Sequence, residues 1–223
     1  MRFTAYPDRE MLFLALADVL AANLAAIVKA NGRATLSVPG GTTPGPLFDI
    51  LSGVDLGWQS VAVVLNDERW VPETDPRSNT ALLRARLFRG PASLATLVPL
   101  HAEAPSPEER LDALTAGLLP HLPLSVLLLG MGADMHTASL FPGADRLAEA
   151  LAPDAPPLMV LRAAQAAEPR VTLTAPVLRA ALHIHILITG TEKRAALEAA
   201  RHLPPHRASI RAFVDHATVH WAE

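Results

Sequence analysis

The sequence predicts an α/β fold in which helices cover both faces of a doubly wound, mostly parallel sheet. Short apolar runs recur along the chain without the polar and apolar alternation of a half-exposed strand, and longer helical patterns separate them. Such runs are typical of strands covered on both faces, and the helices between them fit right-handed crossovers. The chain has 223 residues, of which 50% are hydrophobic. We therefore expect a single domain over residues 1–223.

Composition excludes several classes of function. The chain has no cysteine, which removes disulfides, thiolate nucleophiles and cysteine-based zinc sites. Its formal net charge is −3, and acidic and basic residues are scattered along it, so we expect neither a nucleic-acid surface nor a polybasic membrane patch. A small molecule is the expected partner. The sequence does not specify an oligomeric state, and a monomer is the simplest expectation.

The first element is predicted to be an amphipathic helix between Asp8, a helix-capping residue, and the Asn31–Gly32 pair. Its apolar residues near one face are Leu12, Leu16, Val19, Leu20 and Leu24. Charged residues such as Asp18 interrupt the stretch, which therefore lacks the uncharged core of a signal peptide or a membrane span. We expect a cytoplasmic protein.

Further apolar runs predict strands over residues 34–38, 60–65, 124–129 and 182–189, with weaker candidates at 96–100 and 158–161. A crossover helix is predicted to begin at Ser106. Ser106 can cap this helix, Pro107 fits the first helical position, and Glu109 completes a capping box.

The polar chemistry of the chain follows the predicted strands. The segments PGGTTPG, NDERWVPETDPRSN, GMGADMHTASLFPG and GTEK each come directly after one of them. The carboxyl ends of parallel strands meet at one edge of the sheet, where open α/β sheets bind ligands. We therefore expect these segments to share one crevice.

The loop after residues 34–38 is suited to bind phosphate. Gly40 and Gly41 allow the backbone to approach an oxyanion closely, Thr42 offers a hydroxyl, and Pro44 is placed to open a helix. A tight turn without a ligand is the alternative. The loop lacks the lysine and the spacing of a P-loop, which argues against a nucleoside triphosphate.

The loop after residues 60–65 carries several charges. Arg69 supplies a planar fork suited to phosphate, and Asp67 or Glu68 is placed to hold Arg69 or to contact sugar hydroxyls. A surface cluster of salt bridges is the alternative. Lys193, after the last predicted strand, is a second candidate cation or a solvated side chain.

The loop after residues 124–129 begins like a dinucleotide-binding fingerprint but has Met135 where the third glycine is required. Asp134 and His136 flank that position instead. An imidazole at the end of a buried strand, with a carboxylate nearby, can take a proton from water and be stabilised as it charges. A structural histidine is the alternative. No GxSxG segment is present, which argues against a serine nucleophile.

The remaining histidines predict no metal site. His183 and His185 share one face of a strand, but no third ligand is evident, and we expect both to be partly exposed. No ligand pattern is recognisable at the later histidines, His202, His206, His216 and His220.

Segments along nearly the whole chain, taken together and in order, resemble one known family. They are GGTTP, NDERWVP with a following SN, LGMGADMHTASLFPG, RVTLTAPVL, TGTEK and SIRAFVDHATV. Their combination resembles the 6-phosphogluconolactonases. The resemblance implies a Rossmann-like fold of the sugar-phosphate isomerase and lactonase type. It also implies hydrolysis of 6-phospho-D-glucono-1,5-lactone to 6-phospho-D-gluconate, the second step of the oxidative pentose phosphate pathway, without a metal or an organic cofactor.

The resemblance also implies roles for individual residues. His136 would be the general base, with Asp134 beside it. The phosphate and substrate pocket would be formed by Gly40, Gly41, Thr42, Arg69, Arg170 and Lys193, with Ser78 and Asn79 shaping the neighbouring loop. Arg170 enters only through the resemblance.

One position departs from the family pattern, which usually has glycine where this chain has Met135. A turn that needs a positive φ there would be strained by about 1 to 2 kcal/mol. Two other functions remain as alternatives. One is a glucosamine-6-phosphate deaminase-like isomerase, a group with HIAFNEP where this chain has HTASLFPG. The other is a non-catalytic sugar-phosphate binding protein.

Overall fold

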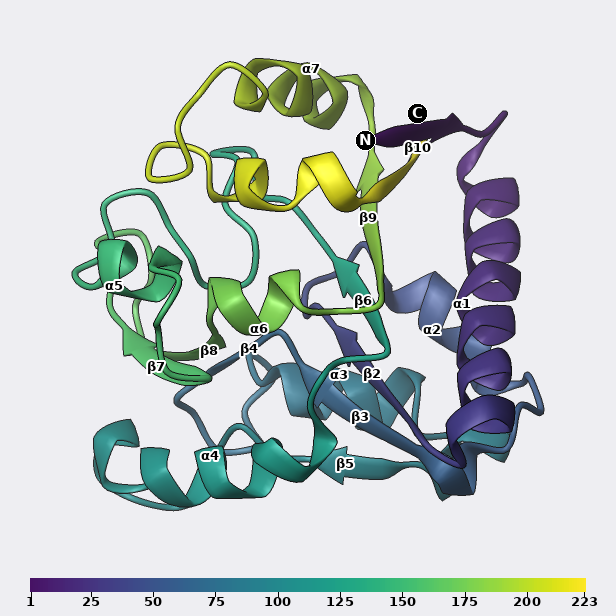
Figure 1. Ribbon diagram of the computed structural model, residues 1–223, viewed down its shortest axis with the longest axis horizontal. Helices are drawn as coiled ribbons and strands as arrows, with labels where there is room; N and C mark the ends of the chain where they lie inside the picture. The colour runs from purple at the N-terminus through teal and green to yellow at the C-terminus, as the bar shows by residue number, and fades with distance from the viewer.

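A seven-stranded sheet forms the centre of the computed structural model, which describes residues 1–223 (Figure 1). Its strands are, in spatial order, β1 (Arg2–Ala5), β10 (Thr218–Ala222), β9 (His183–Thr189), β6 (Val126–Leu129), β2 (Ala34–Val38), β3 (Val61–Leu65) and β5 (Thr96–Val98). Every neighbouring pair in this sheet is parallel. The predicted doubly wound, mostly parallel sheet is confirmed.

A second, antiparallel sheet of three strands lies beside the main one. It consists of β4 (Asp67–Arg69), β8 (Arg170–Leu173) and β7 (Leu158–Leu161), with β8 in the middle. The weak strand candidate at residues 158–161 is therefore a strand, but it belongs to this small sheet. The pairing of β4 with β8 brings together segments that are about a hundred residues apart in the chain.

The strands β1 and β10 were not predicted from the sequence. They pair with each other and join the two ends of the chain at one edge of the main sheet. β1 is the edge strand and has no fully buried residue, and in β10 the buried residues are interrupted by the partly exposed Trp221. Neither segment therefore has the continuous apolar run that marks the central strands.

Helices cover both faces of the main sheet. They are α1 (Arg9–Asn31), α2 (Gly45–Ser52), α3 (Asn79–Arg86), α4 (Leu111–Leu118), α5 (Leu147–Leu151), α6 (Ala175–Arg179) and α7 (Thr191–Ala200). In Figure 1, α1 lies on one side of the sheet and α4, α6 and α7 lie on the other.

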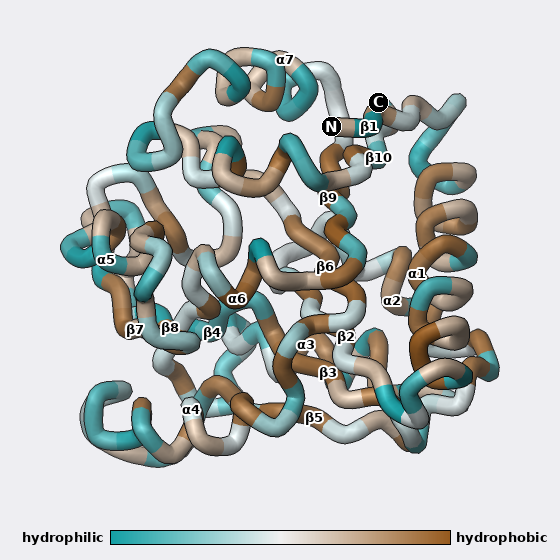
Figure 2. The backbone as a smooth tube through the Cα atoms, in the orientation of Figure 1, coloured by the Kyte–Doolittle hydropathy of each residue, from teal (hydrophilic) through white to brown (hydrophobic).

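Helix α1 forms as the sequence predicts. The Asp8 carboxylate accepts a hydrogen bond from the Met11 amide at 2.8 Å, and Gly32 ends the helix with a φ of 76°. By length and composition alone, α1 could cross a membrane. Its hydrophobic segments alternate with more polar ones in Figure 2, and Leu12, Leu16, Leu20 and Leu24 are fully buried inside the protein. It is therefore a core helix, in which Val19 is only partly buried.

The predicted capping box at Ser106 is wrong. Residues Pro107–Glu109 form a short 3-10 turn, and α4 begins only at Leu111. The Ser106 hydroxyl donates to the Glu109 carboxylate at 3.1 Å and caps no backbone amide. The two side chains thus bind each other, and the tighter turn leaves no amide in the position that a capping box requires.

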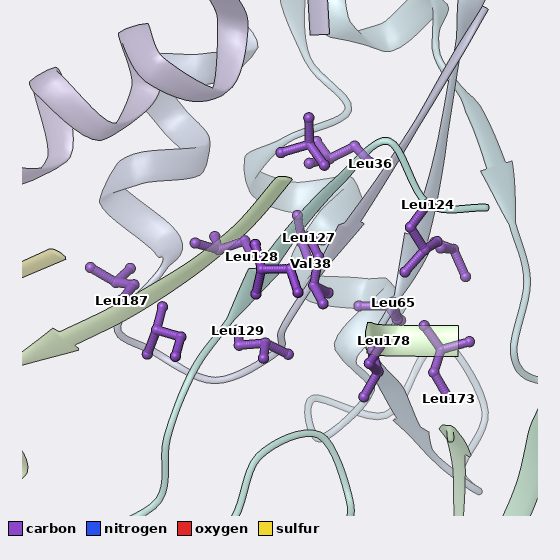
Figure 3. Close-up of a cluster of buried hydrophobic side chains, with 14 of the residues drawn as sticks. Leu36, Val38, Leu65, Leu124, Leu127, Leu128, Leu129, Leu173, Leu178 and Leu187 are labelled. Atoms are coloured by element: carbon purple, nitrogen blue, oxygen red, sulfur yellow. The ribbon is translucent and has the colours of Figure 1, made fainter. Parts of the chain in front are cut away.

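The core is one cluster of 60 buried hydrophobic residues. Figure 3 shows part of it, with leucines of β2, β6 and β9, and with Leu65 of β3 beside Leu173 of β8 and Leu178 of α6. A buried polar side chain, Asn66, ties the strand ends together. It accepts from the Ser37 hydroxyl at 2.7 Å and donates to the Leu128 carbonyl at 2.8 Å.

The order of the strands determines where a ligand can bind. From β2 the chain adds β3 and β5 on one side, whereas β6, β9 and β10 extend the sheet on the other. The order therefore reverses between β2 and β6, which are neighbours. Loops diverge at such a switch point and leave a crevice at the carboxyl ends of the strands.

Candidate active site

A cavity of about 460 Å³ opens at this switch point. Most of the site residues predicted from the sequence line it: Gly40, Gly41, Thr42, Arg69, Asn79, His136, Arg170 and Lys193. Asp134 and Ser78 do not line the cavity, but Asp134 contacts His136, and Ser78 donates to Glu68, the neighbour of Arg69 in the chain. The predicted convergence of the loops on one crevice is confirmed.

His136 lies in the loop after β6 and faces the cavity. Its Nδ1 is 2.5 Å from Oδ1 of Asp134, and its side chain is 25% exposed. The Phe141 ring lies against the imidazole, with the two ring centres 4.1 Å apart. Because Asp134 accepts at Nδ1, the proton of the neutral ring belongs on that nitrogen, and Nε2 keeps its lone pair for a ligand.

The two members of this pair influence each other. Burial alone would raise the pKa of Asp134, but the hydrogen bond and the charge of His136 outweigh burial and hold that pKa below its usual value. Asp134 is therefore ionised at neutral pH. An ionised carboxylate at Nδ1 stabilises the imidazolium that forms when Nε2 takes a proton.

The turn that carries the pair is strained at its centre. Met135 has a φ of 65°, in the left-handed region that L-residues seldom adopt, and Ala138 has a φ of 49°. The turn thus does place Met135 at a positive φ, which is the condition under which the sequence implies strain. The turn is held by a hydrogen bond from the Gly132 amide to the His136 carbonyl at 2.8 Å, and the Met135 carbonyl accepts from the Ile210 amide at 3.2 Å.

Gly132 is the glycine that this turn requires, and the sequence did not single it out. A Cβ at Gly132 would lie 2.2 Å from Nδ1 of His136 and 2.4 Å from Oδ1 of Asp134. The imidazole and the carboxylate therefore occupy the space that any side chain at position 132 would need. The second glycine of the GMG segment was the available signal, but only the path of the loop explains it.

Arg69 and Arg170 lie directly opposite each other across the β4–β8 pair. Like charges in this position repel each other and destabilise a sheet. The Nε atoms of both guanidinium groups are buried without a hydrogen-bond partner. Burial, together with the charges of Arg69 and Arg77, lowers the pKa of Arg170, whereas Asp67 and Glu68 act in the opposite direction. An anion bound between the two guanidinium groups would relieve both the repulsion and the missing contacts.

The glycine loop faces the arginines across the cavity. Gly41 has a φ of 87°, which suits glycine, and a Cβ at Gly40 would lie 1.9 Å from the Asn79 side chain. Helix α2 begins after Pro44 without a side-chain cap, so its first turn is available to an anion. The Lys193 ammonium also lines the cavity, and it donates to the Met131 carbonyl at 2.9 Å.

The two acidic residues at the start of β4 have different environments. The Glu68 carboxylate is buried and accepts from the amides of Arg69, Asn79 and Thr80 and from the hydroxyls of Ser78 and Thr80. It therefore holds the first turn of α3, together with Ser78, whose side chain accepts from the Ala81 amide. Asp67 makes one side-chain hydrogen bond, from the Ser139 hydroxyl at 2.6 Å, and lines the cavity.

The other histidines lie away from the cavity. His183 is exposed, but the prediction that His185 is partly exposed is wrong, because His185 is only 5% exposed. The missed strand β10 covers it, and His220 of that strand binds its Nδ1 at 3.0 Å. No three His, Cys, Asp or Glu side chains of the chain gather closely enough to hold a metal ion.

Comparison with known proteins places this arrangement in a family. A family model described as glucosamine-6-phosphate isomerases/6-phosphogluconolactonase matches residues 7–221. The chain belongs to this family. It is 43% identical to a 6-phosphogluconolactonase of Mesorhizobium japonicum, over 99% of this chain and 94% of that relative. It is 40% identical to a 6-phosphogluconolactonase of Rhizobium meliloti, over 93% of each chain.

Solved structures agree with this family membership. A crystal structure of a 6-phosphogluconolactonase from Shewanella baltica covers 100% of this chain and 98% of its own, with a TM-score of 0.95 and 31% identity. A monomeric glucosamine-6-phosphate deaminase is also similar, with a TM-score of 0.82, but its identity of 18% shows a shared fold alone.

Proposed function

We propose that His136 activates the water with which this protein hydrolyses 6-phospho-D-glucono-1,5-lactone to 6-phospho-D-gluconate, the second step of the oxidative pentose phosphate pathway. One observation carries the proposal. A single cavity is lined by an imidazole, whose Nδ1 contacts Asp134 and whose Nε2 is free, and by two paired arginines, Arg69 and Arg170, whose Nε atoms are buried without a hydrogen-bond partner. A hydrolase of a phosphorylated ester needs these two elements. The similarity to 6-phosphogluconolactonases along nearly the whole chain supports this substrate.

The chemistry uses one histidine twice. Nε2 of His136 takes a proton from water as the water oxygen attacks the lactone carbonyl at C1, and Asp134 stabilises the resulting imidazolium through Nδ1. The tetrahedral intermediate then collapses and breaks the bond between C1 and the ring oxygen. The imidazolium returns its proton to that oxygen, which becomes a hydroxyl group of the product. The histidine is thereby neutral again for the next turnover.

The phosphate is the anchor of the substrate in this proposal. Arg69 and Arg170 provide charge-assisted hydrogen bonds, Lys193 adds a third positive charge, and the glycine loop contributes backbone amides at the start of α2. A phosphate fixed at C6 limits the motion of the ring and holds C1 near His136. Binding energy from the phosphate is thus used to orient C1 of the lactone.

The setting proposed for this activity is simple. We place the enzyme in the cytoplasm as a monomer, with the phosphorylated lactone as its partner and without a metal or an organic cofactor. Sedimentation of the purified protein at several concentrations measures its oligomeric state directly.

The test is a lactonase assay with freshly generated substrate, followed with and without the protein because the lactone also hydrolyses spontaneously. We expect a rate well above this background. The same preparation with glucosamine 6-phosphate should release no ammonia. Ammonia release without lactone hydrolysis would replace the proposal with deamination, and binding of 6-phosphogluconate without turnover would identify a binding protein.

The phosphate anchor has its own test. Arg69→Ala should raise KM for the lactone about ten- to a hundredfold, with a much smaller effect on kcat, because contacts to phosphate act on ground state and transition state alike. Arg84→Ala is a matched control, because Arg84 is exposed and pairs with Glu73 on the surface. An unchanged KM in Arg69→Ala would remove this side chain from the phosphate site.

A further inference from the structure

Asp67 is the only carboxylate among the residues that line the cavity. One of its oxygens, Oδ2, accepts the hydroxyl of Ser139 at 2.6 Å. The other oxygen, Oδ1, has no hydrogen-bond partner in the protein, and it is not one of the polar atoms sealed away from solvent without a partner. No arginine, lysine or histidine nitrogen lies within salt-bridge distance of this carboxylate. Oδ1 is therefore an acceptor that the protein leaves open.

The neighbouring residue shows that this opening is specific to Asp67. Glu68 is also buried, but its two oxygens accept hydrogen bonds from the first turn of α3 and from Arg69. Both carboxylate oxygens of Glu68 are therefore occupied by hydrogen bonds within the protein. Asp67 and Arg69 are two positions apart in β4, and such residues project from the same face of a strand. The open carboxylate therefore shares a wall of the cavity with the phosphate-binding guanidinium.

The Ser139 contact holds the carboxylate in place. Ser139 is fully buried, and its amide donates to the Thr172 hydroxyl at 3.2 Å. It lies three residues after His136, so Asp67 is linked to the loop of the catalytic histidine as well as to the strand of Arg69. Because the buried hydroxyl fixes Oδ2, Oδ1 is the oxygen that has no partner in the protein and can contact a molecule in the cavity.

The chemistry of a carboxylate oxygen restricts what it can contact. It accepts hydrogen bonds and donates none, so it repels the phosphate and the lactone carbonyl, which are acceptors as well. The hydroxyl groups of the sugar ring are the only donors that the substrate offers. We propose that Asp67 accepts a hydrogen bond from a ring hydroxyl of the lactone and thereby selects hydroxylated sugar lactones. This inference rests on the proposed function, and it makes Ser139 a positioning residue.

The test combines enzyme variants with deoxy substrates. The 2-, 3- and 4-deoxy analogues of the phosphorylated lactone each lack one hydroxyl. For one of them, wild-type kcat/KM should fall roughly ten- to a hundredfold, as for loss of a hydrogen bond to a charged group.

Asp67→Ala should lower kcat/KM for the full lactone by a similar factor. For that deoxy analogue, kcat/KM of Asp67→Ala should be nearly the same as that of the wild type. Ser139→Ala should reduce the discrimination in the same direction but less. Asp112→Ala, at an exposed position of α4, is the control and should change nothing.

The alternatives give different patterns. If Asp67→Ala lowers kcat/KM by the same factor for all four lactones while its unfolding temperature stays at the wild-type value, Asp67 acts in the chemical step and the proposal is wrong. A variant that fails to fold is replaced by Asp67→Asn, which keeps one acceptor oxygen and should give intermediate discrimination. Equal discrimination in Asp67→Asn and wild type also overturns it.

Calorimetry separates this inference from the proposed function. If the wild-type protein has no lactonase activity, 6-phosphogluconate and its deoxy analogues are titrated instead. A contact between Asp67 and a hydroxyl predicts that one deoxy acid binds the wild type more weakly than 6-phosphogluconate and that Asp67→Ala abolishes the difference. Equal affinity of the wild type for all of these acids rejects the contact.

Discussion

Histidine occupies two contrasting environments in this protein. His136 is partly exposed, lies on a loop and has an ionised carboxylate at 2.5 Å from its Nδ1. His185 and His220 are buried in neighbouring strands, and their partners are neutral: Tyr6 binds Nδ1 of His220 at 2.8 Å, and Asn23 binds Nε2 of His185 at 3.0 Å. The difference indicates that solvent exposure and the hydrogen-bond partner, rather than residue type, decide whether an imidazole is suited to proton transfer.

The buried pair is built to stay neutral. Burial, with smaller contributions from His220 and His183, lowers the pKa of His185 to about 4, and burial lowers the pKa of His220 to about 4. A neutral imidazole has one donor and one acceptor, so the chain from Asn23 through both rings to Tyr6 can be satisfied without any charge. The same chain ties α1, β9 and β10 to the segment that follows β1.

The largest effect is expected when His136, the proposed general base, is removed. His136→Asn should lower kcat by roughly 10²- to 10⁴-fold, about 3 to 5 kcal/mol of transition-state stabilisation, because this is the usual cost of removing a positioned general base. Its unfolding temperature should remain close to that of wild type. The background-corrected lactonase assay and a thermal melt measure both quantities. A folded His136→Asn protein with nearly the wild-type rate would show that His136 is not the base.

The second effect concerns the geometry of the same pair. Gly132→Ala should lower kcat by up to about a hundredfold, because a Cβ there would displace the imidazole and the carboxylate from their contact. Gly130→Ala is the matched control in the same loop, since a Cβ at Gly130 would meet Pro39 at 3.7 Å, an ordinary contact. Equal losses in the two variants would mean that the loop is sensitive to any side chain and that Gly132 has no special role.

The third effect tests the buried pair through acid stability. The folded-state pKa values of His185 and His220 lie below the ordinary value of 6.5, so the unfolded chain binds more protons than the folded protein between pH 6.5 and 4. The stability contribution is therefore complete above pH 6.5 and is lost as the pH falls towards 4. It is on the order of 3 kcal/mol for one histidine.

Urea unfolding at pH 7.5, 5.5 and 4.5 measures this loss. His185→Asn should be less stable at neutral pH and show a shallower decline in acid, whereas His183→Asn, an exposed neighbour in β9, should follow wild type. Parallel curves for wild type and His185→Asn would contradict the assignment of acid lability to this pair.

The crevice could be predicted from the sequence because the topology of a parallel sheet determines where the segments after its strands lie. Polar segments after apolar runs must meet at the carboxyl edge of a parallel sheet, and Gly41, Arg69, His136 and Lys193 do meet there. To predict that these residues meet, it was sufficient to know that each follows a predicted strand. No knowledge of side-chain contacts was needed.

Contacts between distant segments could not be predicted in the same way. The pairing of β4 with β8 places Arg170 opposite Arg69, and no local pattern around Arg170 indicates it. Asp67 keeps one oxygen without a partner because the first turn of α3 donates to Glu68, and because Ser139, from another loop, donates to the other oxygen of Asp67. Likewise, His185 is buried beside β10, a strand whose sequence lacks a continuous apolar run. Each of these features arises from the packing of segments that are far apart in the chain.

The smallest effect concerns backbone strain, which also separates the two environments. The only non-glycine residues of the chain with positive φ, Met135 and Ala138, lie on either side of His136, whereas His185 and His220 lie in regular strands. Met135→Gly should relieve about 1 to 2 kcal/mol of strain. Part of this gain is offset by the greater freedom of glycine in the unfolded chain and by the loss of Met135 packing against the core. We therefore expect a net stabilisation of at most about 1 kcal/mol, with activity equal to or higher than wild type.

Ala138→Gly is the matched variant, because it removes a single methyl group at the second strained position. Urea unfolding and the lactonase assay of both variants give the comparison. A gain in stability accompanied by a clear loss of rate in both would mean that the strained turn itself holds His136 in its working position.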